Sequence, residues 1–153
     1  MATYLFKTEP GEFAFGDLPA AGGAKAGPGR GQSGARWDGV ENPTACQVLR
    51  AVKMGDEVLV YHTGDEKAVV GLAVATCDAY ADPKRPDLTA AGVWRYPVVD
   101  LVARKAAGTP VTLAMMKADK RFANFVLLKQ ARLSVMAVEP EVDRAIRGLA
   151  GLG

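Results

Sequence analysis

Two consecutive apolar segments limit the possible folds of this chain more than any other feature. Residues 57–63 (EVLVYHT) alternate in the manner of a strand, and residues 68–76 (AVVGLAVAT), after the turn at 64–67, are apolar on both faces. A strand of the second kind belongs in the wall of a small barrel or in the middle of a sheet. Gly71 lets it bend or bulge, as closure of a barrel requires. The two segments therefore predict a hairpin within a curved sheet.

The other predicted elements are short, and strands do not alternate strictly with helices. Strand composition recurs at 4–6, 94–102 and 132–138, helical composition at 43–52, 112–117 and 140–149, and a turn is expected at 108–110. Pro43 and Pro140 stand near helix starts, where the missing N–H costs nothing. About five strands with a few short helices argue against a doubly wound sheet. We therefore expect an α+β protein on a small mixed barrel, as a single domain spanning residues 1–153.

Charge and cysteine content exclude several classes of protein. The chain has 153 residues, a formal net charge of +2 and two cysteines, Cys46 and Cys77. A charge this small argues against a protein that coats nucleic acid through bulk electrostatics, although a local site is still allowed. Two cysteines are too few for a disulfide framework, and they lack metal-ligand spacing. No apolar stretch is long enough to span a membrane and no signal peptide begins the chain, so we expect a cytoplasmic protein without a membrane partner.

Trp37 stands just before a helix start that fixes its position. Asn42 is a good N-cap for the helix predicted from Pro43, because its side-chain oxygen can accept a bond from an orphan backbone N–H. The Trp ring is thus presented beside backbone donors and the positive end of a helix, which suits a flat, partly polar ligand such as a nucleobase. Trp rings are also typical of protein cores. Two interpretations stay open: a stacking surface, or a core residue with Asn42 acting only as a cap.

The segment before Trp37 has the composition of a loop. Residues 20–36 are rich in Ala, Gly and Pro, and a loop of this length in a compact domain is usually functional or mobile. For Lys25 a solvated linker is the simpler interpretation. Arg30 and Arg36 stand close enough to Trp37 for a phosphate contact.

Catalytic signatures are weak. No glycine segment has phosphate-cradle spacing, and the one histidine, His62, has no Cys or His partner for a metal site. Ser134, His62 and Asp82 can be combined into a hydrolytic triad on paper, but no nucleophile elbow accompanies them. A hydrogen-bonded histidine at a strand end and an aspartate that forms a turn are the simpler interpretations. Glu9 is the more interesting carboxylate, because Pro10 favours an extended Glu9 and so holds it beside Lys7 and Thr8 at the end of the first predicted strand.

Several segments, taken in order, resemble the sequence motifs of EVE domains. They are 4–10 (YLFKTEP), 37–45 (WDGVENPTA), 53–56 (KMGD), 61–63 (YHT), 80–83 (YADP) and 132–135 (RLSV). The resemblance implies a PUA-like fold, a small mixed β-barrel flanked by short helices and related to YTH and ASCH domains. It also implies a binding module in place of an enzyme, without cofactor or metal. Such a module holds a modified base of DNA or RNA in an aromatic and polar pocket.

Mapped residue by residue, the resemblance implies a base pocket with phosphate contacts beside it. The base-binding set is Lys7, Thr8, Glu9, Pro10, Trp37, Val40, Asn42, His62, Thr63, Asp82 and Ser134, and the phosphate-contacting set is Arg30, Arg36 and Arg132. We expect Trp37 to stack on the base. Thr8, Asn42 and Ser134 then bind its polar edge. We also expect Trp37→Ala to abolish binding with little loss of fold.

Three positions depart from the family pattern. Tyr4 replaces the usual Trp, Glu41 stands where Arg is common, and Ala81 replaces Pro. Glu41 reverses a charge beside the pocket and puts a phosphate contact from that position in doubt. Two other functions stay open. One is a binder of a free nucleoside, nucleotide or other small molecule in the same pocket. The other is a hydrolase or base-modifying enzyme around His62, Asp82 and Ser134.

Overall fold

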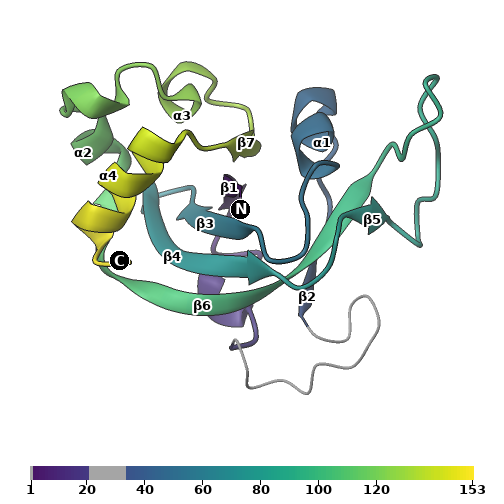
Figure 1. Cartoon of the computed structure of the whole chain (residues 1–153), viewed down its shortest axis with the longest axis horizontal. Coiled ribbons are helices and arrows are strands. Elements are labelled where there is room, and N and C mark those ends of the chain that lie inside the picture. Colours follow the sequence, from purple (N-terminus) through teal and green to yellow (C-terminus); the bar gives the residue numbers. More distant parts are fainter. Residues whose placement is uncertain (1, 21–33) are drawn as a thin grey trace.

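A curved, mixed sheet runs through the middle of the molecule (Figure 1). This computed structural model describes residues 2–20 and 34–153, within which the sheet has seven strands. They are β1 (Thr3–Thr8), β2 (Ala35–Trp37), β3 (Glu57–His62), β4 (Ala68–Ala75), β5 (Tyr80–Ala81), β6 (Pro97–Thr112) and β7 (Val135–Ala137). Their order is β2-β6-β4-β3-β1-β7, and β5 pairs with β6 beside this path. The predicted α+β class is confirmed, with seven strands in place of about five.

Short helices cover the two ends of the sheet (Figure 1). They are α1 (Pro43–Leu49), α2 (Leu113–Lys117), α3 (Val126–Lys129) and α4 (Pro140–Ala150), with 3-10 turns η1 (Phe15–Asp17) and η2 (Lys120–Phe122). In Figure 1, α1 stands at one end, whereas α2, α3 and α4 gather at the other. Pro43 and Pro140 each begin a helix as predicted, and Gly151, with φ 72°, ends α4. Within the described ranges, no helix combines the length and apolar character needed to cross a membrane.

The β3–β4 hairpin forms the centre of the sheet, as its apolar pattern predicts. β4 lies between β3 and β6, and nearly all of its residues are buried. The pairing register shifts on both sides of Gly71, which is the irregularity expected of a strand that bends. Gly71 has a second role, since a Cβ at this position would lie 2.4 Å from the ring of Phe15. The glycine therefore admits the aromatic ring onto the sheet.

One expected turn is absent from the described residues. β6 is 16 residues long and runs through Gly108 and Pro110, where the composition predicts a turn. Pairing with β4 is interrupted over residues 107–110, between Ala106 and Val111, and resumes at Val111 and Thr112, which keeps this segment within one strand. Tertiary pairing thus overrides a weak local preference.

β1 and β3 form a parallel pair, which aligns their ends. Thr3 pairs with Glu57 at the N-terminal ends, and Thr8 pairs with His62 at the C-terminal ends. On its other side β1 pairs with β7 in antiparallel fashion, so the residue before β7 also lies beside the C-terminal end of β1. Several EVE-like motifs therefore meet at one edge of the sheet.

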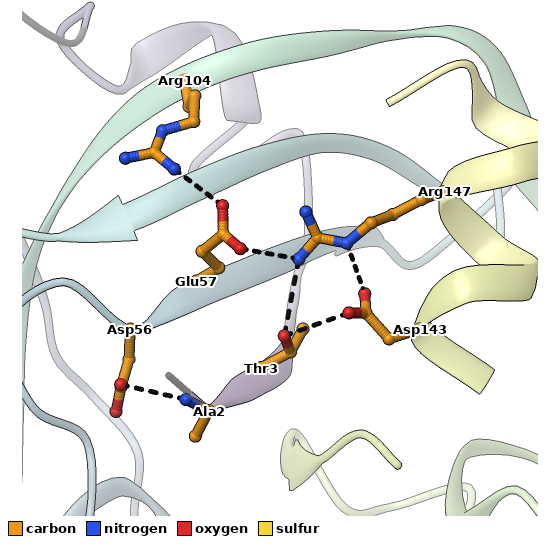
Figure 2. A network of polar contacts seen from close by, with 7 residues as sticks. All are labelled: Ala2, Thr3, Asp56, Glu57, Arg104, Asp143 and Arg147. Atoms are coloured by element: carbon orange, nitrogen blue, oxygen red, sulfur yellow. Dashed lines mark hydrogen bonds and ion pairs between the residues drawn. The ribbon is translucent and has the colours of Figure 1, made fainter. Parts of the chain in front are cut away.

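A cluster of ion pairs closes the opposite, N-terminal end of this parallel pair (Figure 2). Arg147 of α4 donates from Nη2 to Glu57 Oε1 at 2.9 Å and from Nε to Asp143 Oδ1 at 2.7 Å. Arg104 Nη1 donates to the other oxygen of Glu57 at 2.7 Å. Thr3 Oγ1 lies 3.2 Å from Asp143 Oδ2. The cluster ties α4 to the first residues of β1 and β3.

Candidate functional site

A pocket of about 530 Å³ opens beside the C-terminal end of β1. This volume lies within the ordinary range of small-ligand sites. Its lining comes from the end of β1 and the turn after it, from β2 and the loop to α1, and from the residue before β7. The lining residues are Lys7, Thr8, Glu9, Glu12, Phe13, Arg36, Trp37, Asp38, Gly39, Val40, Glu41 and Ser134. The pocket thus brings together seven sequence-predicted site residues: Lys7, Thr8, Glu9, Arg36, Trp37, Val40 and Ser134.

Trp37 belongs both to this pocket and to the hydrophobic core. Its exposed fraction is 7%, and its ring centroid lies 5.4 Å from that of Phe6 and 5.8 Å from that of Phe13, which meets it edge-on. The two interpretations of Trp37 are therefore not exclusive. Removing so large a buried ring leaves a cavity. The expectation that Trp37→Ala preserves the fold is accordingly replaced by an expected loss of stability.

A tight turn after β1 places Phe13 against the pocket. The N–H of Phe13 donates to the carbonyl of Glu9 at 2.9 Å, and the Thr8 hydroxyl donates to the carbonyl of Phe13 at 2.7 Å. The N–H of Gly11 donates to Glu9 Oε1 at 3.1 Å. Because the Thr8 hydroxyl hydrogen is used in this turn, its oxygen remains as an acceptor. Sequence reasoning missed Glu12 and Phe13, although the Pro-Gly pair at 10–11 signals a chain reversal.

Arg36 is oriented by a chain of hydrogen bonds from two neighbouring strands. Its Nε donates to the Tyr80 hydroxyl at 3.0 Å, and that hydroxyl donates to Asp100 Oδ1 at 2.7 Å. Asp100 is fully buried on β6. Burial, together with the hydrogen bond to Asp100, raises the pKa of Tyr80 to about 12. The phenol stays protonated at neutral pH and positions a cation in the pocket wall.

Tyr80 and Asp100 were not assigned to the site from sequence. Tyr80 lies in the YADP segment, and Asp100 is the one charged residue within the apolar run PVVDLV at 97–102. A lone carboxylate in a buried strand requires a hydrogen-bonding partner. That rule signals a polar network, but it does not identify the phenol that supplies the donor.

Lys7 provides a second cation at the pocket. Its Nζ donates to the carbonyl of Ala131 at 2.9 Å and lies 5.9 Å from the ring centroid of Tyr61. Burial lowers the pKa of the Lys7 ammonium. The Lys7 N–H donates to the carbonyl of Ser134 at 2.8 Å, which fixes the half-buried Ser134 at the pocket edge.

Acidic side chains also line the pocket. They are Glu9, Glu12, Asp38 and Glu41. Glu41 Oε2 accepts a bond from Arg85 Nη1 at 2.7 Å, so the charge that departs from the family pattern is paired in this chain. A phosphate at this pocket is therefore favoured near Lys7 and Arg36 and disfavoured along the acidic wall.

The three residues of the possible triad have separate partners. His62 is buried, with Nε2 accepting from the N–H of Phe15 at 2.9 Å and Nδ1 lying 3.1 Å from Glu66 Oε1. Asp82 accepts from the N–H of Lys84 at 2.9 Å. Ser134 lines the pocket, and neither His62 nor Asp82 does. Within residues 2–20 and 34–153, no cluster of His, Cys, Asp or Glu is placed to hold a metal ion.

The remaining predicted site residues lie outside the pocket lining. Asn42 Oδ1 accepts from the N–H of Ala45 at 3.1 Å, which is the predicted N-cap. Thr63 Oγ1 lies 3.4 Å from the carbonyl oxygen of Thr8 and from Glu9 Oε2, so it braces the pocket wall. Pro10 is half-buried in the turn and Arg132 is exposed before β7. Arg30 lies outside the described residues.

Comparisons with known proteins agree with this fold. The chain matches the family model described as EVE domain over residues 2–149, which confirms the resemblance drawn from the motifs. The solution structure of Rpa0253 from Rhodopseudomonas palustris is 34% identical, with TM-score 0.80 over 99% of this chain and 94% of that chain. Human THYN1 protein, in a structure with 5-methylcytosine containing DNA, is 24% identical, with TM-score 0.79 over 98% of each chain. The PUA-like fold is confirmed.

One relative is a longer protein. Methionyl-tRNA formyltransferase of Phenylobacterium zucineum is 33% identical over 123 residues, which are 75% of this chain. The chain spans only 38% of the length of that curated relative. The similarity therefore concerns a part of the enzyme.

Proposed function

Because the chain belongs to the EVE domain family, we propose that it is a non-catalytic module that accommodates a modified nucleobase of DNA or RNA. The observation that carries the proposal is the pocket beside the C-terminal end of β1, with Trp37 and Phe13 in its wall and the cations Lys7 and Arg36 at the same site. The DNA complex of human THYN1, a protein of similar fold, supports nucleic acid as the partner.

The pocket wall suggests how a base is held. The base leaves its stack, or arrives single-stranded, and packs against the aromatic rings. Stacking of one base contributes about 1–3 kcal/mol and is tolerant of base identity. Selectivity then depends on shape and on polar groups such as the Ser134 hydroxyl and the Thr8 oxygen.

The charges of the pocket restrict the path of the backbone. Lys7 and Arg36 attract a phosphate, and the acidic wall repels one. With a net charge of +2 the chain as a whole adds little attraction, so binding weakens with salt by a shallow slope. The same acidic wall disfavours a free nucleotide with several phosphates.

Fluorescence anisotropy with labelled oligonucleotides tests the proposal. The panel carries 5-methylcytosine, 5-hydroxymethylcytosine, 6-methyladenine or no modification, in single strands and duplexes of DNA and RNA. We expect preference for one modified base and a loss of about tenfold in affinity for Arg36→Gln, equivalent to about 1.4 kcal/mol. Arg144→Gln, at an exposed position of α4, is the matched control and leaves affinity unchanged.

Three outcomes contradict the proposal. Equal, weak binding to every oligonucleotide contradicts recognition of a modified base, which we call the reader function. An affinity for the isolated nucleoside equal to that for the oligonucleotide favours the free-ligand alternative. Turnover in a nuclease, esterase and deaminase panel that is lost in His62→Ala establishes the enzymatic alternative.

A further inference from the structure

Exposed apolar side chains gather on one projecting hairpin. Among the described residues, the large hydrophobic side chains that are exposed are Met54, Leu88, Val93 and Trp94. Three of these four belong to residues 82–96, which we call the 82–96 hairpin. It extends from β5 and β6 beyond the body of the sheet, next to the end covered by α1 (Figure 1). Apolar groups concentrated on a projection are typical of a contact surface.

Backbone hydrogen bonds hold the tip of the 82–96 hairpin in shape. The N–H of Thr89 donates to the carbonyl of Val93 at 2.8 Å, and Gly92 closes the turn with φ 81°. Leu88 and Trp94 form an antiparallel bridge. Residues directly opposite in such a bridge project from the same face. Leu88 and Trp94 therefore form one apolar face, 59% and 38% exposed.

The base of the hairpin is fixed to the pocket. Arg85 donates to Glu41, a pocket residue, at 2.7 Å, and its guanidinium lies 4.0 Å from the ring centroid of Tyr96. Arg50 Nε donates to the carbonyl of Trp94 at 2.6 Å. The hairpin is thus braced from the pocket rim and from the end of α1.

One strand supports both the pocket wall and the hairpin. The first residues of β6 pair with β2, where Arg36 faces Asp100, and with β5, where Tyr80 faces Val98. The same two side chains, Tyr80 and Asp100, orient Arg36 in the pocket. β6 therefore fixes the position of the hairpin relative to the pocket.

We propose that the 82–96 hairpin is a wedge for duplex DNA. On this proposal, which rests on the proposed function, Leu88 and Trp94 enter the base stack while the target base occupies the pocket. An extruded base leaves unstacked neighbours, and apolar side chains between base steps offset that cost. The exposed charged residues of the hairpin are Lys84, Asp87 and Arg95, so its exposed charge is positive on balance and attracts phosphates. Continuity with the pocket through Arg85 and Glu41, together with this positive balance of charge, favours DNA over an apolar partner.

Comparison of single-stranded and duplex binding tests the wedge. The variant Leu88→Ser with Trp94→Ser is measured against wild type on DNA that carries the preferred modified base of the panel above. We expect single-strand affinity to change less than twofold and duplex affinity to fall at least tenfold. A mismatch opposite the target base restores most of the loss, because that base leaves the stack more easily. Met54→Ser removes an exposed apolar side chain elsewhere and leaves both affinities unchanged.

A fluorescent base placed next to the target base measures directly whether the neighbouring bases remain stacked. With 2-aminopurine at that position, wild type raises the emission of the duplex by unstacking it, and the double variant does not. Unchanged duplex affinity in the double variant overturns the wedge, as does an equal loss on single strand and duplex. Sedimentation tests whether the hairpin serves self-association instead. A dimeric wild type and a monomeric double variant with the same duplex affinity would show that it does.

Failure of the wedge and failure of the reader function give different results. Wild type that binds modified single strands but no duplex overturns the wedge and retains the pocket. Wild type that binds nothing in the panel overturns both. Arg36→Gln weakens binding to single strand and duplex alike, whereas the hairpin variant weakens duplex binding alone.

Discussion

The two ends of the β1–β3 pair hold their arginines in different ways. At the N-terminal end, Arg147 is bonded to the carboxylates of Glu57 and Asp143 (Figure 2). At the C-terminal end, Arg36 is bonded to the hydroxyl of Tyr80, and within the part of the chain that the structure describes it has no ion pair. A carboxylate neutralises a guanidinium, whereas a phenol only orients it. The first arrangement suits a structural tie and the second suits an anionic ligand.

The partners of Asp100 and Glu57 extend this comparison. Glu57 meets two arginines directly, and its side chain is 19% exposed. Asp100 is fully buried and acts on Arg36 through the intervening hydroxyl. Because the Tyr80 hydroxyl lies between them, Asp100 orients the Arg36 guanidinium without forming an ion pair with it. The positive charge of Arg36 at the pocket lining is thus oriented by Tyr80 and, among the described residues, is not paired directly with a carboxylate.

The largest expected effect is on the pocket wall itself. Trp37→Ala deletes a buried ring that packs on Phe6 and Phe13, and should lower the free energy of unfolding by about 3–5 kcal/mol. Urea denaturation measures the loss. Trp94→Ala, at a Trp that is 38% exposed, should change stability by less than about 0.5 kcal/mol. A similar loss of unfolding free energy in the two variants would contradict a role of Trp37 in the hydrophobic core.

The ion-pair cluster gives the next effect. Arg147→Met removes the arginine partner of Asp143 and one of the two arginine partners of Glu57, and all three side chains are less than 20% exposed. Breaking a fully buried pair costs about 3–5 kcal/mol, and residual solvation here reduces the expected loss to about 2 kcal/mol. Arg144→Met on the exposed face of α4 should cost less than about 0.5 kcal/mol. Nucleic-acid affinity should stay unchanged in both, and a loss in Arg147→Met alone would contradict the division between the two ends.

The sequence predicts the centre of the sheet better than the strands that frame the pocket. The apolar runs at 57–63 and 68–76 appear as β3 and β4, because strands buried on both faces have a composition that few other structures share. The first two residues of β2 (Ala35–Trp37) fall within the loop expected at 20–36. Its three residues are extended because β6 pairs with them, and no local preference indicates that pairing.

The candidate site was predictable only where its residues belong to recognisable local segments, and not where tertiary pairing brings residues together. Motif resemblance identifies residues near the end of β1, since those positions are contiguous in sequence. Phe13, Tyr80 and Asp100 reach the site by a chain reversal and by cross-strand pairing. Asn42 and His62 have the simpler roles of cap and hydrogen-bonded strand end, which the residue types alone allowed.

A smaller effect distinguishes the orientation of the Arg36 guanidinium from its charge. Tyr80→Phe removes one donor to Asp100 and the acceptor of Arg36, and should lower the free energy of unfolding by about 1–2 kcal/mol. Nucleic-acid affinity should fall about threefold, with an unchanged salt slope because the charge of Arg36 remains. Tyr4→Phe is the control, since its hydroxyl reaches the carbonyl of Ala51 only at 3.5 Å. Full affinity in Tyr80→Phe would show that Arg36 needs no positioning.

The smallest effect is the pH dependence of this same network. The pKa of Tyr80 is raised from 10.0 to about 12, so the folded state holds its phenolic proton more tightly than the unfolded chain. The resulting stability is fully present below pH 10 and is lost as pH rises toward about 12. Between pH 10 and about pH 11, wild type should lose at most about 1 kcal/mol more than Tyr80→Phe. Urea denaturation of both proteins across this range measures the difference, in which the other tyrosines cancel. Parallel curves would mean that the proton of Tyr80 is not held by Asp100, and that the phenol orients Arg36 as a simple acceptor.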